Sequence, residues 1–107
     1  MRIVYTHTAR RDLRGIYEYI AYTLMVPKTA RDLTNKIMAE VRALENLPER
    51  NPLCKEEPWY SRGVRFLSVG NYLVFYTVKG EEGVVSIARI LYGGRDISRQ
   101  LEDTGEW

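Results

Sequence analysis

The sequence contains very little cysteine and histidine. Among its 107 residues, Cys54 is the one cysteine and His7 the one histidine. A lone thiol excludes an intrachain disulfide, and one Cys with one His argues against a structural zinc site. We therefore expect neither a metal nor a cofactor. Sparse cysteine is also typical of a reducing compartment, so a cytoplasmic location is expected.

Long apolar runs are missing too. No stretch approaches the ~20 apolar residues that a membrane-spanning helix needs, and residues 1–8 lack the apolar core of a secretion signal. The sequence therefore predicts no partner in the membrane. A chain of 107 residues with 45% hydrophobic residues can still bury a small core, so we expect one globular domain, residues 1–107.

The charge is mildly basic but unevenly distributed. The net charge is +2, and residues 61–99 contain six Arg or Lys against three Asp or Glu. Five of those six cations are arginines, whose planar fork suits phosphates and carboxylates. The final seven residues carry three acidic side chains instead. The distribution permits a nucleic-acid or acidic-protein partner without specifying either.

The first half of the chain predicts a strand followed by two helices. Residues 2–6 have the β-branched and aromatic character of a strand. A helix capped by Thr8 then follows, because apolar residues recur every three or four positions as far as Leu24. A second helix begins at Pro27, or a turn later in a capping box of Thr29 and Asp32, and ends before Pro48. The short connection predicts an antiparallel helical hairpin.

The second half predicts three strands and a short helix. The strands are Val64–Val69, Tyr72–Lys79 and Val84–Leu91, and Gly70-Asn71 suits a type II′ turn between the first two. Asp96 can cap a helix through Leu101, and residues 102–107 are expected to be free of the domain. The fold class is therefore α+β, in the order β-α-α-β-β-β with a short C-terminal helix. The helical hairpin is expected on one face of a mostly antiparallel sheet.

When the residues of neighbouring strands are paired outward from the two turns, the pairs predict which side chains share a face of the sheet. Arg65, Tyr76 and Arg89 then lie on one face, with about 12 Å between the Cα atoms of the two arginines. The uncharged opposite face, which includes Phe66 and Phe75, is expected to lie under the helices. A one-residue bulge would reverse this assignment. The alternative is structural, because arginines on a small sheet often pair with carboxylates or lie over apolar surface.

Two longer patterns carry a family resemblance. The run VGNYLVFY at 69–76 is followed by IARILYGGRDI at 87–97, and the first helix carries the spacing Ala9-x-x-Asp12-Leu13-x-x-Ile16-x-x-Tyr19-Ile20. Together they resemble the RelE/ParE superfamily of toxins from bacterial type II toxin–antitoxin modules. The resemblance covers nearly the whole chain, and both segments of the second half look more like the ParE side.

The resemblance implies a small toxin that inhibits growth and is neutralised by a cognate antitoxin. ParE-like members poison DNA gyrase, whereas RelE-like members cleave mRNA on the ribosome. Arg65 falls on a strand arginine of the RelE-like pattern and Arg95 lies near its second arginine, but a terminal His-Tyr pair is missing. A non-toxic binding protein with the same fold is a third possibility. The candidate target-facing or catalytic residues are Arg65, Arg89, Arg95, Tyr76 and Tyr92.

The antitoxin contact is expected at an edge of the sheet and on the helical hairpin, at its far end. Few core positions lie near enough to cover all the apolar residues there, so a partner strand or helix could bury them. The candidate residues are Tyr19, Tyr22, Leu24, Met25 and Val26.

Overall fold

The computed structural model describes residues 1–94 and 96–107 and contains one four-stranded sheet. The strands are β1 (Arg2–Tyr5), β2 (Arg65–Val69), β3 (Tyr72–Lys79) and β4 (Val84–Tyr92), in the spatial order β1-β4-β3-β2. The β1–β4 pair is parallel and the other two pairs are antiparallel. The α+β class and the mostly antiparallel sheet are therefore confirmed.

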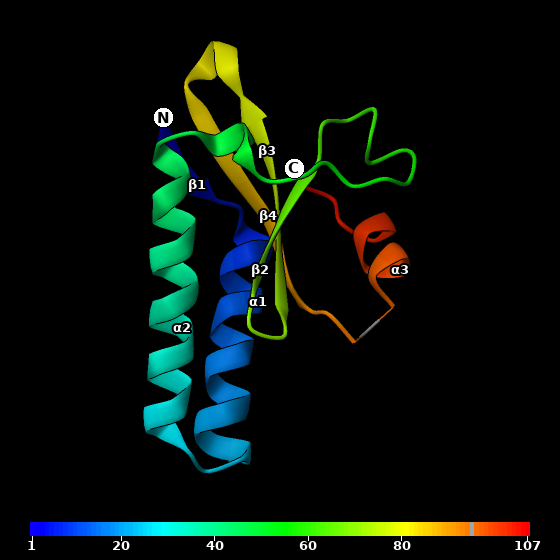
Figure 1. The fold of residues 1–107 in the computed structure, drawn as a ribbon. Coiled ribbons are helices and arrows are strands. Elements are labelled where there is room, and N and C mark those ends of the chain that lie inside the picture. The colour runs from blue at the N-terminus through cyan, green and yellow to red at the C-terminus, as the bar shows by residue number, and fades with distance from the viewer. Residues whose placement is uncertain (95) are drawn as a thin grey trace.

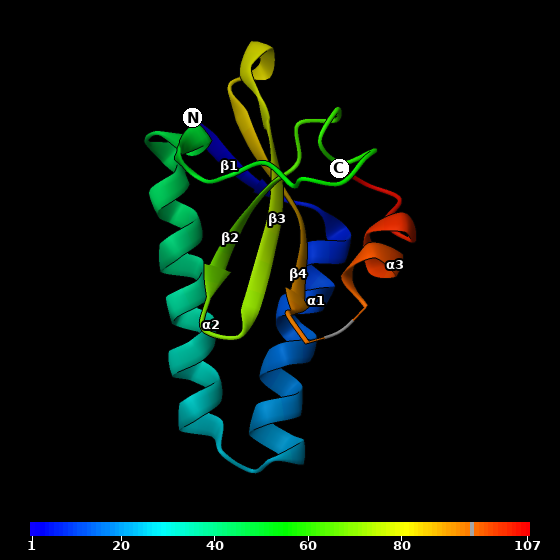
Figure 2. The same ribbon diagram turned by 45° about the vertical axis from the view of Figure 1, so that its right-hand side comes forward.

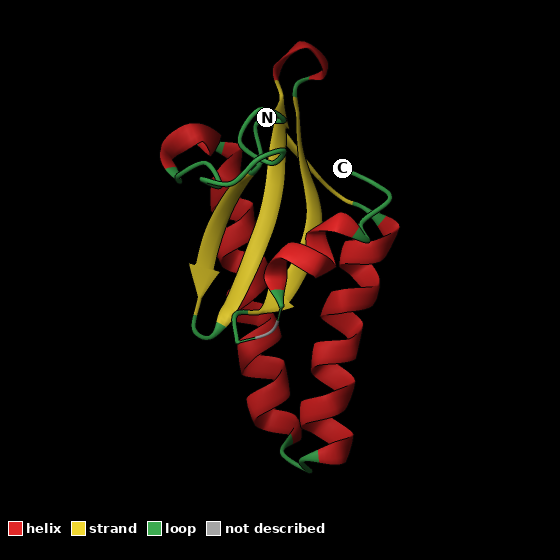
Figure 3. Ribbon diagram, turned by 90° about the vertical axis from the view of Figure 1, so that its right-hand side faces the viewer, coloured by secondary structure: helices red, strands yellow, loops and turns green. Residues whose placement is uncertain are grey.

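Helices cover both faces of this sheet (Figure 1). Helix α1 (His7–Glu18) continues as a short π-helical segment to Thr23, and α2 (Pro27–Arg42) runs back beside it. This hairpin covers one face and extends well beyond the ends of the strands (Figure 2). The short helix α3 (Ile97–Glu102) lies on the other side, in front of the strands in Figure 3.

Local caps explain where the helices begin. Helix α1 starts one residue before the predicted cap, because the Thr6 hydroxyl accepts a hydrogen bond from the Ala9 N–H at 3.1 Å. The same hydroxyl donates to the Ala88 carbonyl at 3.1 Å, so Thr6 joins the helix to β4 in a way that Thr8 could not. Helix α2 begins at Pro27, the first of the two predicted starts.

A β-bulge changes the predicted assignment of faces. The register pairs Phe75 with Arg89 but Tyr76 with Ile87, which leaves Ala88 unmatched on β4. One extra residue moves every later side chain of that strand to the opposite face. Arg65 and Arg89 therefore do not share a face, and the prediction that they converge is wrong.

The bulge also explains why the hairpin covers the other face of the sheet. The prediction placed the helices over the uncharged face that contains Phe66 and Phe75. The buried cluster under α1 and α2 instead contains Val74, Tyr76 and Ile87 from the strands. Arg89 has been moved off this face, and Arg65 lies at the beginning of its strand. The area under the helices is therefore apolar, as close packing requires.

The opposite face has its own apolar cluster, beneath α3 and the loop before β2. Its buried members include Cys54, Trp59, Phe75 and Leu101, and Trp107 packs against them. The Trp107 and Trp59 rings are 5.4 Å apart. The expectation of a free tail is therefore wrong, because a large aromatic side chain at its end finds apolar partners on the sheet.

Polar contacts hold this tail as well. The Glu106 carboxylate accepts from the Thr8 N–H at 3.2 Å, and Lys79 Nζ donates to the Trp107 main-chain oxygen at 2.8 Å. Asp96 caps α3 as predicted, since its Oδ1 accepts from the Arg99 N–H at 3.3 Å. The segment after β4 is thus fixed at several points along its length.

We expect Trp107→Ala to lower the free energy of unfolding by about 2 kcal/mol, because it removes apolar burial and an aromatic contact. Thermal and urea unfolding followed by circular dichroism would measure the loss. Tyr60→Ala is the control, since Tyr60 is the aromatic residue next to Trp59 in the loop before β2 and is 53% exposed. Equal stability of Trp107→Ala and the wild type would show that the Trp107 side chain adds nothing to the domain.

Candidate functional site

Arg89 forms the most extensive side-chain network among the predicted site residues. Its Nε and Nη2 atoms donate to the two carboxylate oxygens of Asp12, at 2.8 and 3.2 Å. Its Nη1 donates to the Gln100 carbonyl and the Thr104 hydroxyl, both at 3.1 Å. The side chains of Arg89 and Asp12 are only 11% and 15% exposed. Arg89 therefore ties β4 to α1 and to the end of α3.

Asp12 also completes the hydrogen bonding of β4. Strand β1 ends at Tyr5, so β4 has no neighbouring strand on that side beyond Ile87. There the Asp12 carboxylate accepts from the Ile90 N–H at 2.9 Å, while Thr6 donates to the Ala88 carbonyl. Two side chains at the start of the hairpin thus take the place of a missing strand, which satisfies buried backbone groups.

Arg65 and Tyr76, which are paired across β2 and β3, form a second network. Arg65 Nη1 donates to the carbonyls of Glu49 and Asn51, at 3.0 and 2.6 Å. The Tyr76 hydroxyl donates to the Pro48 carbonyl at 2.7 Å and accepts from Asn51 Nδ2 at 3.1 Å. Both side chains therefore hold residues 48–51 against the sheet. Burial raises the pKa of the Tyr76 phenol, which opposes its use as a base at neutral pH.

Tyr92 lies near the end of β4 and is 46% exposed, with its ring 5.6 Å from that of Tyr72. A Cβ atom at Gly94 would lie 2.7 Å from the Tyr92 ring, so the backbone passes this ring at a distance that glycine permits. The predicted site residue Arg95 lies outside the described residues.

The predicted site residues therefore do not come together in one site. Arg65 and Tyr76 are directly paired across β2 and β3, whereas Arg89 is engaged with Asp12 and Tyr92 is at the end of β4. A direct role of any of them on a target stays a prediction. Asp12 is the important residue that the site prediction omitted. Its signal was an acidic residue within the apolar spacing of α1, three positions after Ala9 and four before Ile16.

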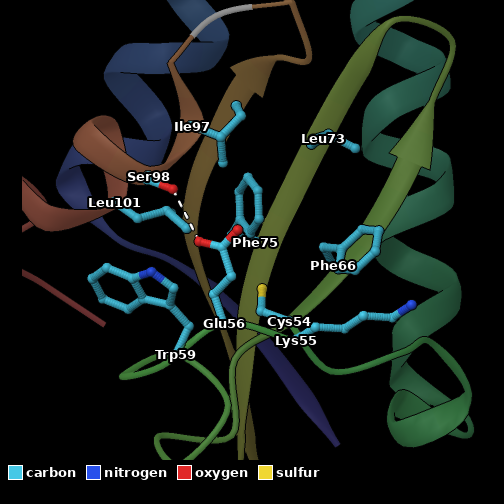
Figure 4. Close-up of a pocket in the computed structure, with 10 residues that line it drawn as sticks. All are labelled: Cys54, Lys55, Glu56, Trp59, Phe66, Leu73, Phe75, Ile97, Ser98 and Leu101. Carbon is cyan, nitrogen blue, oxygen red and sulfur yellow. Dashed lines mark hydrogen bonds between the residues drawn. The ribbon is translucent and has the colours of Figure 1, made fainter.

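A hollow of about 240 Å³ opens on the α3 side of the sheet (Figure 4). Its floor and rims are mainly apolar, and Ser98 Oγ donates across it to the Glu56 carboxylate at 3.1 Å. Burial and the nearby Glu56 carboxylate raise the pKa of the Cys54 thiol, so the reactive thiolate is disfavoured. The residues around it are Cys54, Lys55, Glu56, Trp59, Phe66, Leu73, Phe75, Ile97, Ser98 and Leu101.

A second, wider depression lies along the helical hairpin. Its lining includes Leu13 and Tyr17 of α1 and Met38 of α2, together with Arg10 and Arg14. Neither depression holds a set of metal-binding side chains, since the described residues contain no group of three or more His, Cys, Asp or Glu suited to a metal ion. Across residues 1–94 and 96–107, no helix is long and apolar enough to cross a membrane.

The chain matches a known family over most of its length. Residues 3–97 fit the sequence pattern of the ParE toxin of the type II toxin–antitoxin system, parDE. The chain belongs to the ParE toxin family. The same match confirms the RelE/ParE resemblance seen in the sequence.

Solved structures agree with this ParE assignment. A chain from the chromosomal ParDE toxin–antitoxin system of P. aeruginosa is similar with 27% identity and a TM-score of 0.68, over 84% of this chain and 92% of that one. A chain of the toxin–antitoxin complex RelBE2 from Mycobacterium tuberculosis shares the fold at 19% identity and a TM-score of 0.56, over 85% and 95%. No curated protein matches this ParE chain.

For this ParE chain we expect Asp12→Ala to lower the free energy of unfolding by about 3 kcal/mol, because it leaves Arg89 as a largely buried charge without its partner. Arg89→Ala should be similarly destabilising. The double variant should lose less than the sum of the two, since neither charge is then left unpaired. Urea unfolding of the four proteins measures the coupling.

Lys28 and Asp32 provide the matched control. Their 2.8 Å ion pair has nearly the same length as that of Arg89 and Asp12, but the side chains are 84% and 62% exposed. Asp32→Ala should leave the unfolding midpoint essentially unchanged, because water screens an exposed pair. An Asp12→Ala variant as stable as Asp32→Ala would contradict a structural role for the Arg89–Asp12 pair.

Proposed function

We propose that this ParE toxin inhibits growth by poisoning DNA gyrase and that a cognate antitoxin neutralises it. Its family and its likeness to the P. aeruginosa ParDE structure support a toxin with a dedicated antitoxin. The mRNA-cleaving alternative makes a stricter demand on the chemistry, because it requires specific side chains to be free to reach RNA.

The internal engagement of Arg89 and Tyr76, two of the predicted catalytic residues, favours the gyrase proposal over RNA cleavage. Cleavage requires a base for the 2′-hydroxyl, cationic stabilisation of the phosphate and an acid for the leaving oxygen. Arg89 is instead paired with Asp12, and the Tyr76 hydroxyl is bonded to the Pro48 carbonyl. An agent that poisons gyrase needs only a surface complementary to the enzyme. The choice of gyrase as the target therefore rests on the bonding of Arg89 and Tyr76 within the domain.

The end of the helical hairpin offers the antitoxin an apolar surface. Tyr22 is 70% exposed and Met25 is 78% exposed, in the region that projects beyond the strands (Figure 2). Exposed apolar groups gathered in one place are typical of protein interfaces. Further along the hairpin, Arg10 and Arg14 have no ion pair with any described residue, which favours a partner segment that carries acidic side chains.

A target assay tests the proposed activity. We expect the purified chain to inhibit supercoiling of relaxed plasmid by DNA gyrase, while mRNA in expressing cells stays intact. Adding the purified product of the adjacent open reading frame, as antitoxin, should restore supercoiling. Codon-positioned cuts in translated mRNA together with unaffected gyrase would instead establish the ribosome-dependent endoribonuclease. Expression without growth arrest would favour the non-toxic binding protein.

The hairpin surface has its own test. We expect the double variant Tyr22→Ser/Met25→Asn to bind the antitoxin at least tenfold more weakly, because it removes two exposed apolar side chains. Folding should be unaffected, since Asn tolerates the positive φ of 60° at Met25. Calorimetric titration with the antitoxin measures the affinity, and Tyr60→Ser, which changes an exposed tyrosine elsewhere, is the control. Unchanged affinity of the double variant would place the antitoxin contact elsewhere.

A further inference from the structure

Three separate segments of the chain enclose the hollow on the α3 side of the sheet. The loop before β2 contributes Glu56 and Trp59, the strands contribute Phe66 and Phe75, and α3 contributes Leu101. Its volume of about 240 Å³ lies just below the ~300–1,000 Å³ of sites that hold drug-sized ligands. The hollow therefore has the dimensions of a site for a small molecule.

Aromatic rings make up much of the lining of this hollow. Trp59 and Phe75 are only 5% and 3% exposed, so the surrounding domain holds both rings in place. The ring of Phe66 lies 6.3 Å from that of Phe75. A recess whose side chains are already fixed can bury the hydrocarbon part of a ligand without the cost of ordering them.

One negative charge lies within this apolar lining. Figure 4 shows the Glu56 side chain extending into the hollow, whereas the side chain of Lys55 points away from Glu56. Glu56 Oε2 accepts from Ser98 Oγ at 3.1 Å. The Glu56 carboxylate forms no ion pair with any residue that the structure describes, and the residue is exposed. A ligand that enters the hollow can therefore reach an accessible carboxylate with no cation of the domain bound to it.

The charge of Glu56 acts within the hollow. Burial and, after it, the Glu56 carboxylate raise the pKa of the Cys54 thiol, which lies in the same lining. Apolar walls concentrate the field of a charge in a recess, so the hollow attracts cations and repels anions. Among the described residues that line it, Glu56 is the one carboxylate, whereas an inorganic cation such as Ca²⁺ takes about six to eight oxygen ligands. The complementary ligand is therefore an organic cation.

We propose that the hollow binds a small organic amine, with its ammonium group on the Glu56 carboxylate and its apolar stem against Phe66 and Phe75. The ammonium donates to the carboxylate in a charge-assisted hydrogen bond, and a cation beside aromatic rings gains further attraction from them. This site goes beyond the proposed action on gyrase and does not depend on it. It also lies on the face of the sheet opposite the helical hairpin, where we place an antitoxin contact.

Three probes of nearly equal size but different charge test the site on the wild-type chain. They are phenethylamine, phenethyl alcohol and phenylacetate. We expect the amine to bind at least fivefold more tightly than the alcohol and the carboxylate to bind more weakly than either, because the amine alone has a charge opposite to that of Glu56. Tryptophan fluorescence follows the titration, since Trp59 lines the hollow, and amide chemical shifts in NMR spectra locate the bound probe.

A substitution that removes the charge of Glu56 tests its role directly. Glu56→Gln keeps a side-chain oxygen that can accept from Ser98, so the unfolding midpoint should be unchanged. We expect it to weaken binding of phenethylamine at least fivefold, to about the affinity of phenethyl alcohol. Glu57→Gln is the matched control, because it changes the net charge equally at a carboxylate that is bonded to Ser61 and lies outside the lining. It should bind the amine like the wild type.

The probe series decides the proposal even if a variant fails to fold. Equal affinity of the wild-type chain for the amine and the alcohol, no saturable binding of the amine, or amide shifts confined to residues outside the hollow would each overturn it. A folded Glu56→Gln that binds the amine like the wild type would also overturn it, as would an equal loss in Glu57→Gln. The supercoiling assay measures the proposed action on gyrase separately, so failure of one proposal leaves the other standing.

Discussion

The position of Asp12 on α1 determines much of the architecture. Its carboxylate meets both the Arg89 guanidinium and the Ile90 N–H, so one acidic side chain fixes the helical hairpin to the centre of the sheet. Through Arg89 the same network reaches the end of α3, on the opposite face. A domain of this size has little free energy to spare, and a largely buried ion pair of this kind is costly when half of it is missing. The two layers of helices are therefore coupled through the strand between them.

Most of the fold follows from local patterns in the sequence. Apolar spacing placed the two long helices, alternating and β-branched residues placed the strands, and Gly70 adopts the positive φ of 58° that its place in the turn requires. The faces of the sheet could not be assigned in the same way. One unmatched residue, Ala88, reverses everything after it on β4, and nothing in the composition of that strand marks it as a bulge. The bulge puts Arg89 where its side chain meets Asp12, a partner 77 positions away in the sequence.

The candidate site shows a related limit of sequence reasoning. Arg65, Arg89 and Tyr76 have side chains that can act on a phosphate, and all three lie on the expected strands. A guanidinium that binds a phosphate serves equally well for a carboxylate or a set of carbonyl groups within the protein. Which of these it meets depends on the packing of α1 and of residues 48–51, and that packing cannot be derived from the strand sequences alone. The docked tail is hidden from the sequence for a similar reason, since Trp107 packs on Trp59 of a loop far away in the chain.

The parallel pairing of β1 with β4 has a consequence for synthesis of the chain. Thr6 and Ala88 are 82 positions apart, so the first strand finds its neighbour only when nearly the whole protein has left the ribosome. Until then the apolar face of the α1–α2 hairpin has no sheet to cover it. Contacts between distant segments form slowly, and exposed apolar surface in a partly made chain favours aggregation. A ribosome that stops before β4 therefore releases an incomplete product without a closed core. Premature termination before β4 should therefore yield material for proteolysis and no folded domain.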